Sequence, residues 1–453
     1  MHDLIVIGAG PGGLDAAMEA AEAGLKTALV EKADLGGTCL NWGCIPTKIM
    51  LGATSAIEEL AGQTKMKVAS GSIDVDFAAL QRRKEKLVAG TRKATALRLK
   101  TLGVDVIYGT AHVTAPGKIE VTGDTPTTLE YDKLVIASGS RPTFFPGLEP
   151  DNDAVIDSNG FLALESMPES LIVVGAGFIG IEMAQIAHRL GTKIHMVDAL
   201  DRVAAAEDPE VSKVLGSMFK RWKWNMRLGV RVQSVTTRNG KACLRLDSGD
   251  EIEADKALVA VGRGPVTDGM NLEALGITIE RSGIKINEYL EAAPNVYAIG
   301  DVNGIIQLAH AASHQAHYVV SRLSGKTEAA YVSGPVPSII YGSPEVMHVG
   351  KSVHEVIQSG QPCEVSTLQL AANPMAQAHA ATQGVVKVIW SDGKVAGVTA
   401  VGHDVSRLTT PSTMIVQEGW APEDAYETIF PHPSLDEALM GALKAERKTV
   451  SAD

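Results

Sequence analysis

The chain has 453 residues, and its 53 acidic side chains outnumber its 41 basic ones, giving a formal net charge of −12. This length suggests about three domains of roughly 150 residues, and the acidic balance disfavours nucleic-acid binding. Four cysteines are too few for a secreted disulfide framework, and no apolar run approaches the ~18 residues of a membrane span, so we expect a cytoplasmic protein that binds neither nucleic acid nor membrane.

Residues 2–32 read HDLIVIGAGPGGLDAAMEAAEAGLKTALVEK and predict a strand, a glycine turn, a helix and a second strand. In such a unit Gly8 makes the tight turn, Gly10 lets backbone N–H groups approach a pyrophosphate, and Gly13 lets the helix pack closely on the strand. Glu31 ends the second strand, where a carboxylate accepts hydrogen bonds from a ribose. The segment therefore predicts a dinucleotide site.

Residues 36–48, GGTCLNWGCIPTK, place Cys39 and Cys44 close together. A zinc site needs a second ligand pair, and none is near in sequence. Cys44 lies where a helix is expected to begin, with Pro46 in its first turn, and a helix N-terminus favours a thiolate. A working dithiol is the favoured interpretation, and two buried packing cysteines are the alternative.

Residues 170–199, SLIVVGAGFIGIEMAQIAHRLGTKIHMVDA, repeat the first motif. The glycines are Gly175, Gly177 and Gly180, and Asp198 stands 18 residues after the third glycine, the same spacing as Glu31 from Gly13. Two matched copies predict two dinucleotides, and a bound flavin with a diffusing nicotinamide is the commonest pairing.

Asp198 bears on which nicotinamide nucleotide binds. A carboxylate about 4 Å from the 2′-phosphate of NADP costs on the order of 4 kcal/mol per unit charge at an effective dielectric constant of about 20. This repulsion favours NAD, although the nearby Arg202 could soften it.

Exchange with a dithiol substrate needs a base that can hold a proton near neutral pH, which suits histidine. Among twelve histidines, His432 lies between Pro431 and Pro433, and Glu437 follows five residues later, where it could orient the imidazole. An ordinary surface histidine is the alternative at this point.

Six segments together resemble the class I pyridine nucleotide-disulfide oxidoreductases, over essentially the full length of the chain. The resemblance is strongest to the members that oxidise protein-bound dihydrolipoyl groups. The segments are GGTCLNWGCIPTK at 36–48, LVIASGSRP at 134–142, LVAVGRGP at 258–265, NVYAIGDV at 295–302, VPSIIYGSPEV at 336–346 and PHPSLDEAL at 431–439.

This resemblance implies an α/β fold with two Rossmann-like dinucleotide-binding domains, one for FAD and one for NAD, a central domain and a C-terminal α+β dimerisation domain. The implied domains are an FAD-binding domain over 1–143, an NAD-binding domain over 144–266, a central domain that completes the FAD site over 267–332, and an interface domain over 333–453. Prolines and glycines near 142–146 and 334–337 agree coarsely with two of these boundaries.

The resemblance also implies the roles of the site residues. Cys44 faces the flavin, Cys39 exchanges with the substrate, and Lys48 pairs with Glu182 beside the flavin. His432, with Glu437, reaches the disulfide from the partner subunit, which implies a homodimer. The implied FAD-binding residues are Gly8, Gly10, Gly13, Glu31, Thr38, Lys48, Ala111, Ser138, Gly139, Asp301 and Ala309; the implied NAD-binding residues are Gly175, Gly177, Gly180, Glu182, Asp198 and Gly262; no metal is implied.

The implied activity is oxidation of a lipoyl-bearing protein's dihydrolipoyl group to lipoyl with reduction of NAD. Trp42 in the disulfide loop and Val266 after VGRGP depart from the family pattern, as do residues 313–315 and the segment ANPMAQA at 372–378, which lacks an arginine common there. Two alternatives therefore stay open: a related NAD(P)H-dependent reductase of another disulfide, and a flavin-bearing subunit of a complex whose dithiol reports redox state without turnover.

Overall fold

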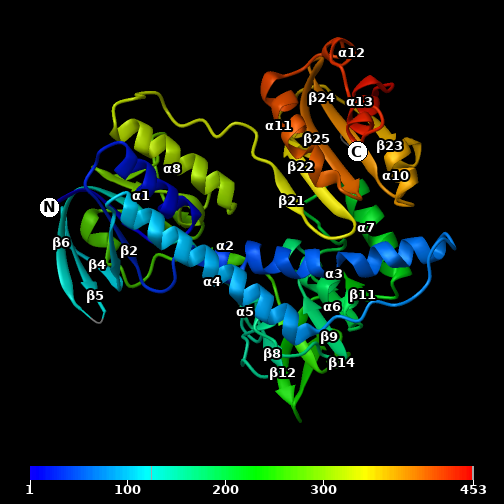
Figure 1. The fold of residues 1–453 in the computed structure, drawn as a ribbon, viewed down its shortest axis with the longest axis horizontal. Helices are drawn as coiled ribbons and strands as arrows, with labels where there is room; N and C mark the ends of the chain where they lie inside the picture. Colours follow the sequence, from blue (N-terminus) through cyan, green and yellow to red (C-terminus); the bar gives the residue numbers. More distant parts are fainter. Residues whose placement is uncertain (124, 451–453) are drawn as a thin grey trace. The chain divides into compact units, whose positions relative to one another are not determined.

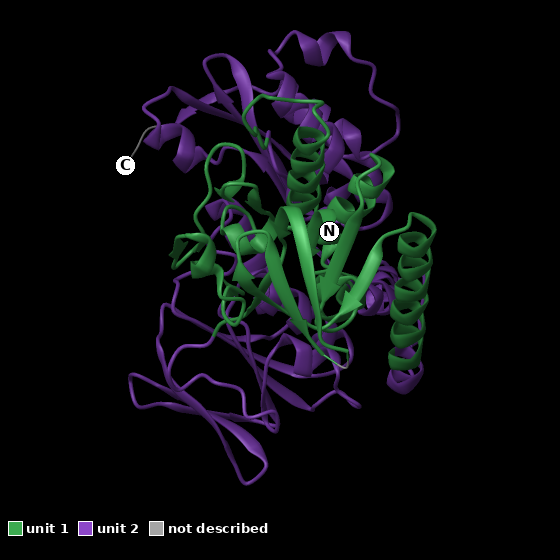
Figure 2. Cartoon of the chain, turned by 90° about the vertical axis from the view of Figure 1, so that its left-hand side faces the viewer, with its two compact units in different colours: residues 1–47, 81–143, 262–333 green, residues 48–80, 144–261, 334–453 purple. Residues whose placement is uncertain are grey.

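The computed structural model describes residues 1–123 and 125–450, which divide into two compact units (Figure 2). Unit 1 comprises residues 1–47, 81–143 and 262–333, and unit 2 comprises residues 48–80, 144–261 and 334–453. Two of the passages of the chain between the units fall inside long helices, α3 (Cys44–Lys65) and α4 (Phe77–Thr101). None of the described helices is both long enough and apolar enough to cross a membrane.

Unit 1 is built on a mainly parallel sheet whose central strand is β1 (His2–Ile7). Parallel neighbours β2 (Thr27–Glu31) and β6 (Thr127–Ile136) flank β1, which explains why its apolar run is buried on both faces. The helices α1 (Pro11–Glu22) and α8 (Ala309–Leu323) pack together, and a Cβ on Gly12 would lie only 3.0 Å from that of Ala312 (Figure 1). The remaining elements of unit 1 are α2 (Gly37–Trp42), β3 (Asp105–Tyr108), β4 (Thr110–Ala115), β5 (Lys118–Thr122), β7 (Ser140–Pro142), β16 (Arg263–Pro265), η1 (Leu272–Leu275), β17 (Ile279–Glu280), β18 (Gly283–Ile284), β19 (Glu291–Ala293), β20 (Val296–Ala298) and η2 (Gly300–Asn303).

Unit 2 contains a second parallel sheet, in the strand order β11-β10-β9-β15-β8. The glycine turn of the second motif joins β9 (Ser170–Val174) to α6 (Phe178–Arg189), and β10 (Lys193–Asp198) ends at the acidic residue. A small antiparallel sheet of β12, β13 and β14 packs beside this parallel sheet. The bounds are β8 (Val155–Ile156), α5 (Ser158–Leu162), α7 (Pro209–Arg221), β11 (Asn225–Leu228), β12 (Val232–Arg238), β13 (Lys241–Leu246), β14 (Glu251–Ala254) and β15 (Lys256–Val259).

The C-terminal part of unit 2 is an antiparallel sheet in the order β21-β22-β25-β24-β23-β26, with α11 and α13 packed on it. Trp390 is fully buried in this layer, and its Nε1 donates to Ser366 Oγ at 2.8 Å. The bounds are β21 (Ser338–Ile340), β22 (Glu345–Gly350), α9 (Val353–Gln358), β23 (Cys363–Gln369), η3 (Leu370–Ala372), α10 (Pro374–Ala378), β24 (Val385–Ser391), β25 (Lys394–Gly402), η4 (Val405–Leu408), α11 (Thr409–Glu418), α12 (Asp424–Glu427), α13 (Asp436–Lys444) and β26 (Lys448–Val450).

The predicted fold class is confirmed: two strand–glycine turn–helix units sit in parallel sheets, and an α+β layer follows them. Residues 267–332 add β20 to the first sheet through parallel pairing with β6. The bounds of the four predicted domains stay a prediction.

A cavity of about 480 Å³ in unit 2 contains a buried carboxyl group without a counter-ion. Glu207 and Asp208 line it together with His348 and Glu355. Lys387 Nζ neutralises Asp208 at 2.9 Å, but no contact of the Glu207 carboxyl is found within the described residues. Burial, assisted by the neighbouring Asp208 charge, raises the pKa of Glu207 from 4.5 to about 7. The folded protein therefore holds a proton that the unfolded chain releases.

Replacing Glu207 by glutamine is expected to stabilise the protein above neutral pH. Because the folded-state pKa is raised, this group costs stability progressively between about pH 4.5 and 7, up to about 3 kcal/mol. The apparent melting temperature of Glu207→Gln should therefore exceed the parent value at about pH 8 and match it at about pH 5.

Glu355 supplies a control of opposite sign in the same cavity. Hydrogen bonds from the Ser352 amide and hydroxyl lower the pKa of Glu355, so Glu355→Gln should lose stability at neutral pH and lose less in acid. Equal melting temperatures of Glu207→Gln and the parent at both pH values would refute the assignment of a buried proton to Glu207.

Candidate functional site

The first glycine turn leaves open space in front of helix α1. Gly8 has a φ of +99°, and a Cβ on Gly13 would collide with the carbonyl oxygen of Gly8. A Cβ on Gly10 would meet no atom within 4 Å, and no side chain caps the N-terminus of α1. The free backbone amides at the N-terminus of α1, with open space in front of them, can bind a pyrophosphate group.

The second turn has the same geometry. Gly175 has a φ of +111°, a Cβ on Gly180 would collide with the Gly175 carbonyl oxygen, and a Cβ on Gly177 would again meet nothing within 4 Å. The N-terminus of α6 likewise carries no side-chain cap. Unit 2 thus presents a second cradle for a pyrophosphate.

The acidic residue of each motif holds its own glycine turn. Glu31 accepts from the Ala9 amide at 2.7 Å and from the Ala33 amide at 2.8 Å. Asp198 accepts in the same way from Ala176 at 2.6 Å and Leu200 at 2.7 Å. Each carboxylate oxygen has a further lone pair, so both acids can also accept from a ribose hydroxyl.

Arg202, which from the sequence could soften the Asp198 charge, makes its hydrogen bond within its own loop. Its Nη2 donates to the carbonyl oxygen of Ala205 at 2.7 Å, within its own loop. No hydrogen bond or ion pair joins Arg202 to Asp198 within the described residues. Arg202 thus does not neutralise Asp198 by direct pairing, and the preference for NAD over NADP stays a prediction.

Asp301, one of the implied FAD residues, belongs to a polar chain that joins three distant segments of unit 1. Ser140 Oγ donates to Asp301 Oδ2 at 2.5 Å and accepts from Arg263 Nε at 2.8 Å. Sequence reasoning did not select Ser140 or Arg263, although both lie in segments that carry the family resemblance. This chain fixes the orientation of the Asp301 carboxylate.

The other implied nucleotide residues lie on turns and element ends. Ser138 Oγ donates to the Val266 carbonyl at 2.7 Å, and Gly139 has a φ of +74° with open space around it. Thr38 lies in α2, Ala111 is buried in β4, and Ala309 is the first residue of α8. Gly262 has a φ of +138° with no atom within 4 Å of a Cβ built on it, and it is the first residue of the third segment of unit 1.

The cysteine segment lies against the first glycine turn. The Gly36 amide donates to the Ala9 carbonyl at 2.8 Å, and a Cβ on Gly37 would lie 2.7 Å from the Cα of Gly10. Cys39 is half-buried in α2, and Cys44 is exposed as the first residue of α3. The segment that contains both cysteines thus begins beside the first glycine turn, and its role as a redox-active dithiol stays a prediction.

Lys48 and Glu182, which are 134 residues apart, form a close ion pair in unit 2. Lys48 Nζ donates to both carboxylate oxygens of Glu182, at 2.8 and 3.0 Å. Glu182 also accepts from the Tyr341 amide at 2.9 Å, and the Lys48 ammonium lies 4.6 Å from the centre of the Tyr341 ring. Tyr341 was missed from sequence, since only the packed structure places residue 341 beside α6.

His432 and Glu437 form a hydrogen-bonded pair at the start of α13. His432 Nδ1 lies 2.8 Å from Glu437 Oε1, and the imidazole is 74% exposed. The hydrogen bond from His432, with one from the Ser434 amide, lowers the pKa of Glu437. An ionised carboxylate only accepts, so Nδ1 carries the proton and Nε2 is left as the basic nitrogen.

The structure thus has two glycine turns with open space before a helix, a pair of neighbouring cysteines and a histidine hydrogen-bonded to a glutamate. Across the described residues, no three His, Cys, Asp or Glu side chains converge to hold a metal ion.

Comparison with known proteins gives a consistent result. Residues 2–316 match the pyridine nucleotide-disulphide oxidoreductase family, and residues 336–443 match its dimerisation domain, which supports a homodimer. A protein named dihydrolipoyl dehydrogenase from Chlorobaculum parvum is 36% identical over 97% of this chain and 96% of its own length.

Two solved structures share the fold. The structure of LpdA from Mycobacterium tuberculosis has a TM-score of 0.90 at 25% identity and covers 97% of this chain and 99% of its own. The HOCl-induced flavoprotein disulfide reductase RclA from Escherichia coli has a TM-score of 0.87 at 26% identity, with the same coverage of 97% and 99%. The chain belongs to the pyridine nucleotide-disulphide oxidoreductases, a family of flavoenzymes that use FAD and NAD.

Proposed function

We propose that the protein is a dihydrolipoyl dehydrogenase, which oxidises the dihydrolipoyl group of a partner protein to lipoyl and passes two electrons and a proton to NAD⁺. The relatives that carry this name support the proposal because they match the whole chain at 32–36% identity. The observation that carries it is the His432–Glu437 pair, because an oriented base is needed for thiol exchange and not for nucleotide binding.

Thiol exchange begins when His432 Nε2 removes the proton from one dihydrolipoyl thiol. The resulting thiolate attacks Cys39 Sγ of the oxidised Cys39–Cys44 pair, so a mixed disulfide forms and Cys44 leaves as a thiolate. The second dihydrolipoyl sulfur then attacks the mixed disulfide and displaces Cys39, and its proton passes to the departing Cys39 sulfur. The substrate departs as cyclic lipoyl disulfide, and both cysteines have been reduced.

When bound, FAD supplies an electron acceptor for the reduced dithiol, and NAD supplies the final hydride acceptor. Gly8, Gly10 and Gly13 would hold the FAD pyrophosphate, and Glu31 its ribose, while Asp301 would bind the ribityl chain. Gly175, Gly177, Gly180 and Asp198 would do the same for NAD. Lys48, held by Glu182, would place a fixed positive charge beside the reacting part of the flavin.

Dimerisation completes this site in the proposal. Because His432 lies within the segment that matches the family's dimerisation domain, we propose that His432 of one protomer serves the cysteines of its partner. A monomeric variant should then bind FAD but fail to oxidise dihydrolipoamide.

The proposal is tested by steady-state NADH formation from dihydrolipoamide and NAD⁺. Many turnovers per flavin are expected. Formation of no more than one equivalent of NADH would contradict the proposal and would favour a redox-sensing subunit instead.

A related reductase of another disulfide is the second candidate. Its support is the likeness to the disulfide reductase RclA and the exposed Trp42 between the two cysteines, which changes access to the dithiol. NADH oxidation with other disulfides as acceptors separates the two: this candidate predicts a kcat/KM for another disulfide well above that for lipoamide.

Asp198→Asn is expected to weaken the preference for NADH over NADPH. Removing one carboxylate charge about 4 Å from the 2′-phosphate relieves on the order of 4 kcal/mol, about a thousandfold before screening by salt. We therefore expect the ratio of kcat/KM values for NADH and NADPH to fall by at least about tenfold. An unchanged ratio would show that Asp198 does not set the preference.

A further inference from the structure

Helix α6 carries a buried stripe of three polar side chains, Glu182, Gln185 and Arg189, at the spacing i, i+3 and i+7. Residues at this spacing lie on one face of a helix. The Glu182 residue is 6% exposed, Gln185 is fully buried, and the Arg189 side chain is 4% exposed. Each of the three holds backbone or side chains that belong to other segments of unit 2.

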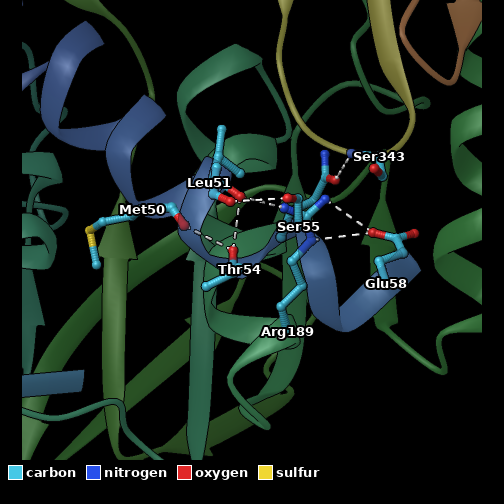
Figure 3. A network of polar contacts seen from close by, with 9 residues as sticks. Met50, Leu51, Thr54, Ser55, Glu58, Arg189 and Ser343 are labelled. Atoms are coloured by element: carbon cyan, nitrogen blue, oxygen red, sulfur yellow. Dashed lines mark hydrogen bonds and ion pairs between the residues drawn. The ribbon is translucent and has the colours of Figure 1, made fainter. Parts of the chain in front are cut away.

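Arg189, at the C-terminal end of the stripe, binds helix α3 at two points (Figure 3). Its Nη2 and Nε donate to Glu58 Oε2 at 3.0 and 3.2 Å, and its Nη1 donates to the carbonyl oxygen of Leu51 at 3.2 Å. Thr54 Oγ1 donates to the same carbonyl at 3.2 Å and to that of Met50 at 2.9 Å. The Thr54 bonds lie within α3, so the contacts of Arg189 with Leu51 and Glu58 are the ones that hold α3 against α6.

Gln185, in the middle of the stripe, fixes the loop between β21 and β22. Its Oε1 accepts from the Ser343 amide at 2.8 Å, and a Cβ on Gly342 would collide with its amide group. The Tyr341 amide is bound by Glu182. The loop that covers Lys48 is thus held by the same stripe.

The residues of α3 that meet this stripe are themselves regularly spaced. Lys48, Leu51 and Glu58 stand at i, i+3 and i+10 and face α6 on one side of the helix. The carbonyl that Arg189 binds is therefore one turn beyond Lys48. A slide of α3 along its axis would move the Lys48 backbone relative to Glu182 and so disturb the 2.8 Å contact between the two side chains.

The Arg189–Glu58 pair is not an exposed ion pair of small effect. The Glu58 side chain is 27% exposed, and burial raises its pKa while the adjacent Arg189 charge opposes that rise. Removing the guanidinium would leave a partly buried carboxyl group without its cation, so α3 would be expected to move or Glu58 to take up a proton.

We propose that Arg189, through Glu58 and the Leu51 carbonyl, is a positioning residue that sets helix α3 in the register at which Lys48 meets Glu182. The inference rests on the proposed function, in which Lys48 lies beside the flavin. Arg189 itself touches neither substrate nor cofactor. It links the helix that begins at Cys44 to the helix whose N-terminus forms the NAD cradle.

The test compares Arg189→Met, Lys48→Met and the double variant as FAD-loaded proteins. The readouts are the rate of flavin bleaching by saturating NADH without oxygen, the visible absorption spectrum of the oxidised flavin, and the apparent melting temperature. Lys387→Met is the matched control, because it breaks another buried ion pair of unit 2, with Asp208 and Glu210, that has no part in the site.

We expect Arg189→Met to slow bleaching by on the order of tenfold and to shift the flavin spectrum in the same direction as Lys48→Met. The double variant should be no slower than Lys48→Met, since both changes remove one contact, while the losses in melting temperature should add. Lys387→Met should lower the melting temperature without slowing bleaching. If Arg189→Met does not fold, Arg189→Lys, which keeps the charge but not the fork geometry, should show a smaller slowing.

Three outcomes would overturn the inference. The first is bleaching by Arg189→Met at the parent rate while Lys48→Met is slow, which leaves the proposed function intact. The second is a double variant in which the separate effects of the two changes on the bleaching rate add in full. The third is a Lys387→Met variant whose bleaching is slowed as much as that of Arg189→Met. A Lys48→Met variant that bleaches at the parent rate would remove the proposed role of Lys48 as well.

Discussion

His432→Gln is expected to slow dihydrolipoamide oxidation by about a thousandfold, within the range of about 10² to 10⁴ typical of a lost general base. Glutamine can donate its amide N–H to the Glu437 carboxylate, but it cannot take a proton from the substrate thiol. The loss of rate should appear in kcat. It should also appear in the rate at which dihydrolipoamide reduces the enzyme in a single turnover.

The control for this variant is reduction by NADH, which does not require the base. Flavin content and the rate of bleaching by NADH should equal those of the parent. Glu437→Gln should be less impaired than His432→Gln, because the imidazole keeps its proton-accepting nitrogen and loses only its orientation. Parent-like turnover of His432→Gln would remove the residue from the mechanism.

Cys44→Ser is expected to reduce dihydrolipoamide oxidation to background. A serine hydroxyl cannot form the disulfide that Cys39 needs for exchange, so no electrons can leave the substrate. In an anaerobic reductive titration, the variant should take up one electron pair per flavin, whereas the parent should take up two. The long-wavelength absorption expected from a thiolate beside the oxidised flavin should also be lost.

Cys243→Ser is the matched control for the loss of a thiol. Cys243 is 7% exposed in β13 of unit 2, and the proposal gives it no part in exchange. Cys243→Ser should oxidise dihydrolipoamide at the parent rate and should take up two electron pairs per flavin, as the parent does. If Cys44→Ser still oxidised dihydrolipoamide through many turnovers, the dithiol assignment would be wrong.

Local patterns in the sequence were enough to predict the two glycine turns and the start of α3. The glycine spacing alone predicts the positive φ of Gly8 and Gly175 and the close packing at Gly13 and Gly180. Cys44 begins a helix, as Pro46 suggested. These features depend on neighbours within one strand–turn–helix unit, so a short stretch of chain contains the needed information.

Contacts between segments that are distant in the sequence were harder to predict. The pairing of Lys48 with Glu182 was expected only through the family resemblance, and nothing in the sequence pointed to Tyr341 or to the Arg189–Glu58 pair. The polar residues at i, i+3 and i+7 on α6 were a usable signal, because they interrupt an otherwise apolar face. Their partners depend on the packing of α3 and of the loop at 341–343, which periodicity does not specify. The cytoplasmic location and the lipoyl-bearing partner stay predictions.

Asp198 holds the glycine turn in shape and is also proposed to help bind NAD, which has a consequence for coenzyme engineering. A swap to arginine would attract the extra phosphate of NADP, yet it would also release the amides of Ala176 and Leu200, which hold the turn in shape. Such a single exchange should therefore yield an enzyme with poor affinity for either coenzyme. A redesigned turn that satisfies those two amides on its own would have to accompany the swap.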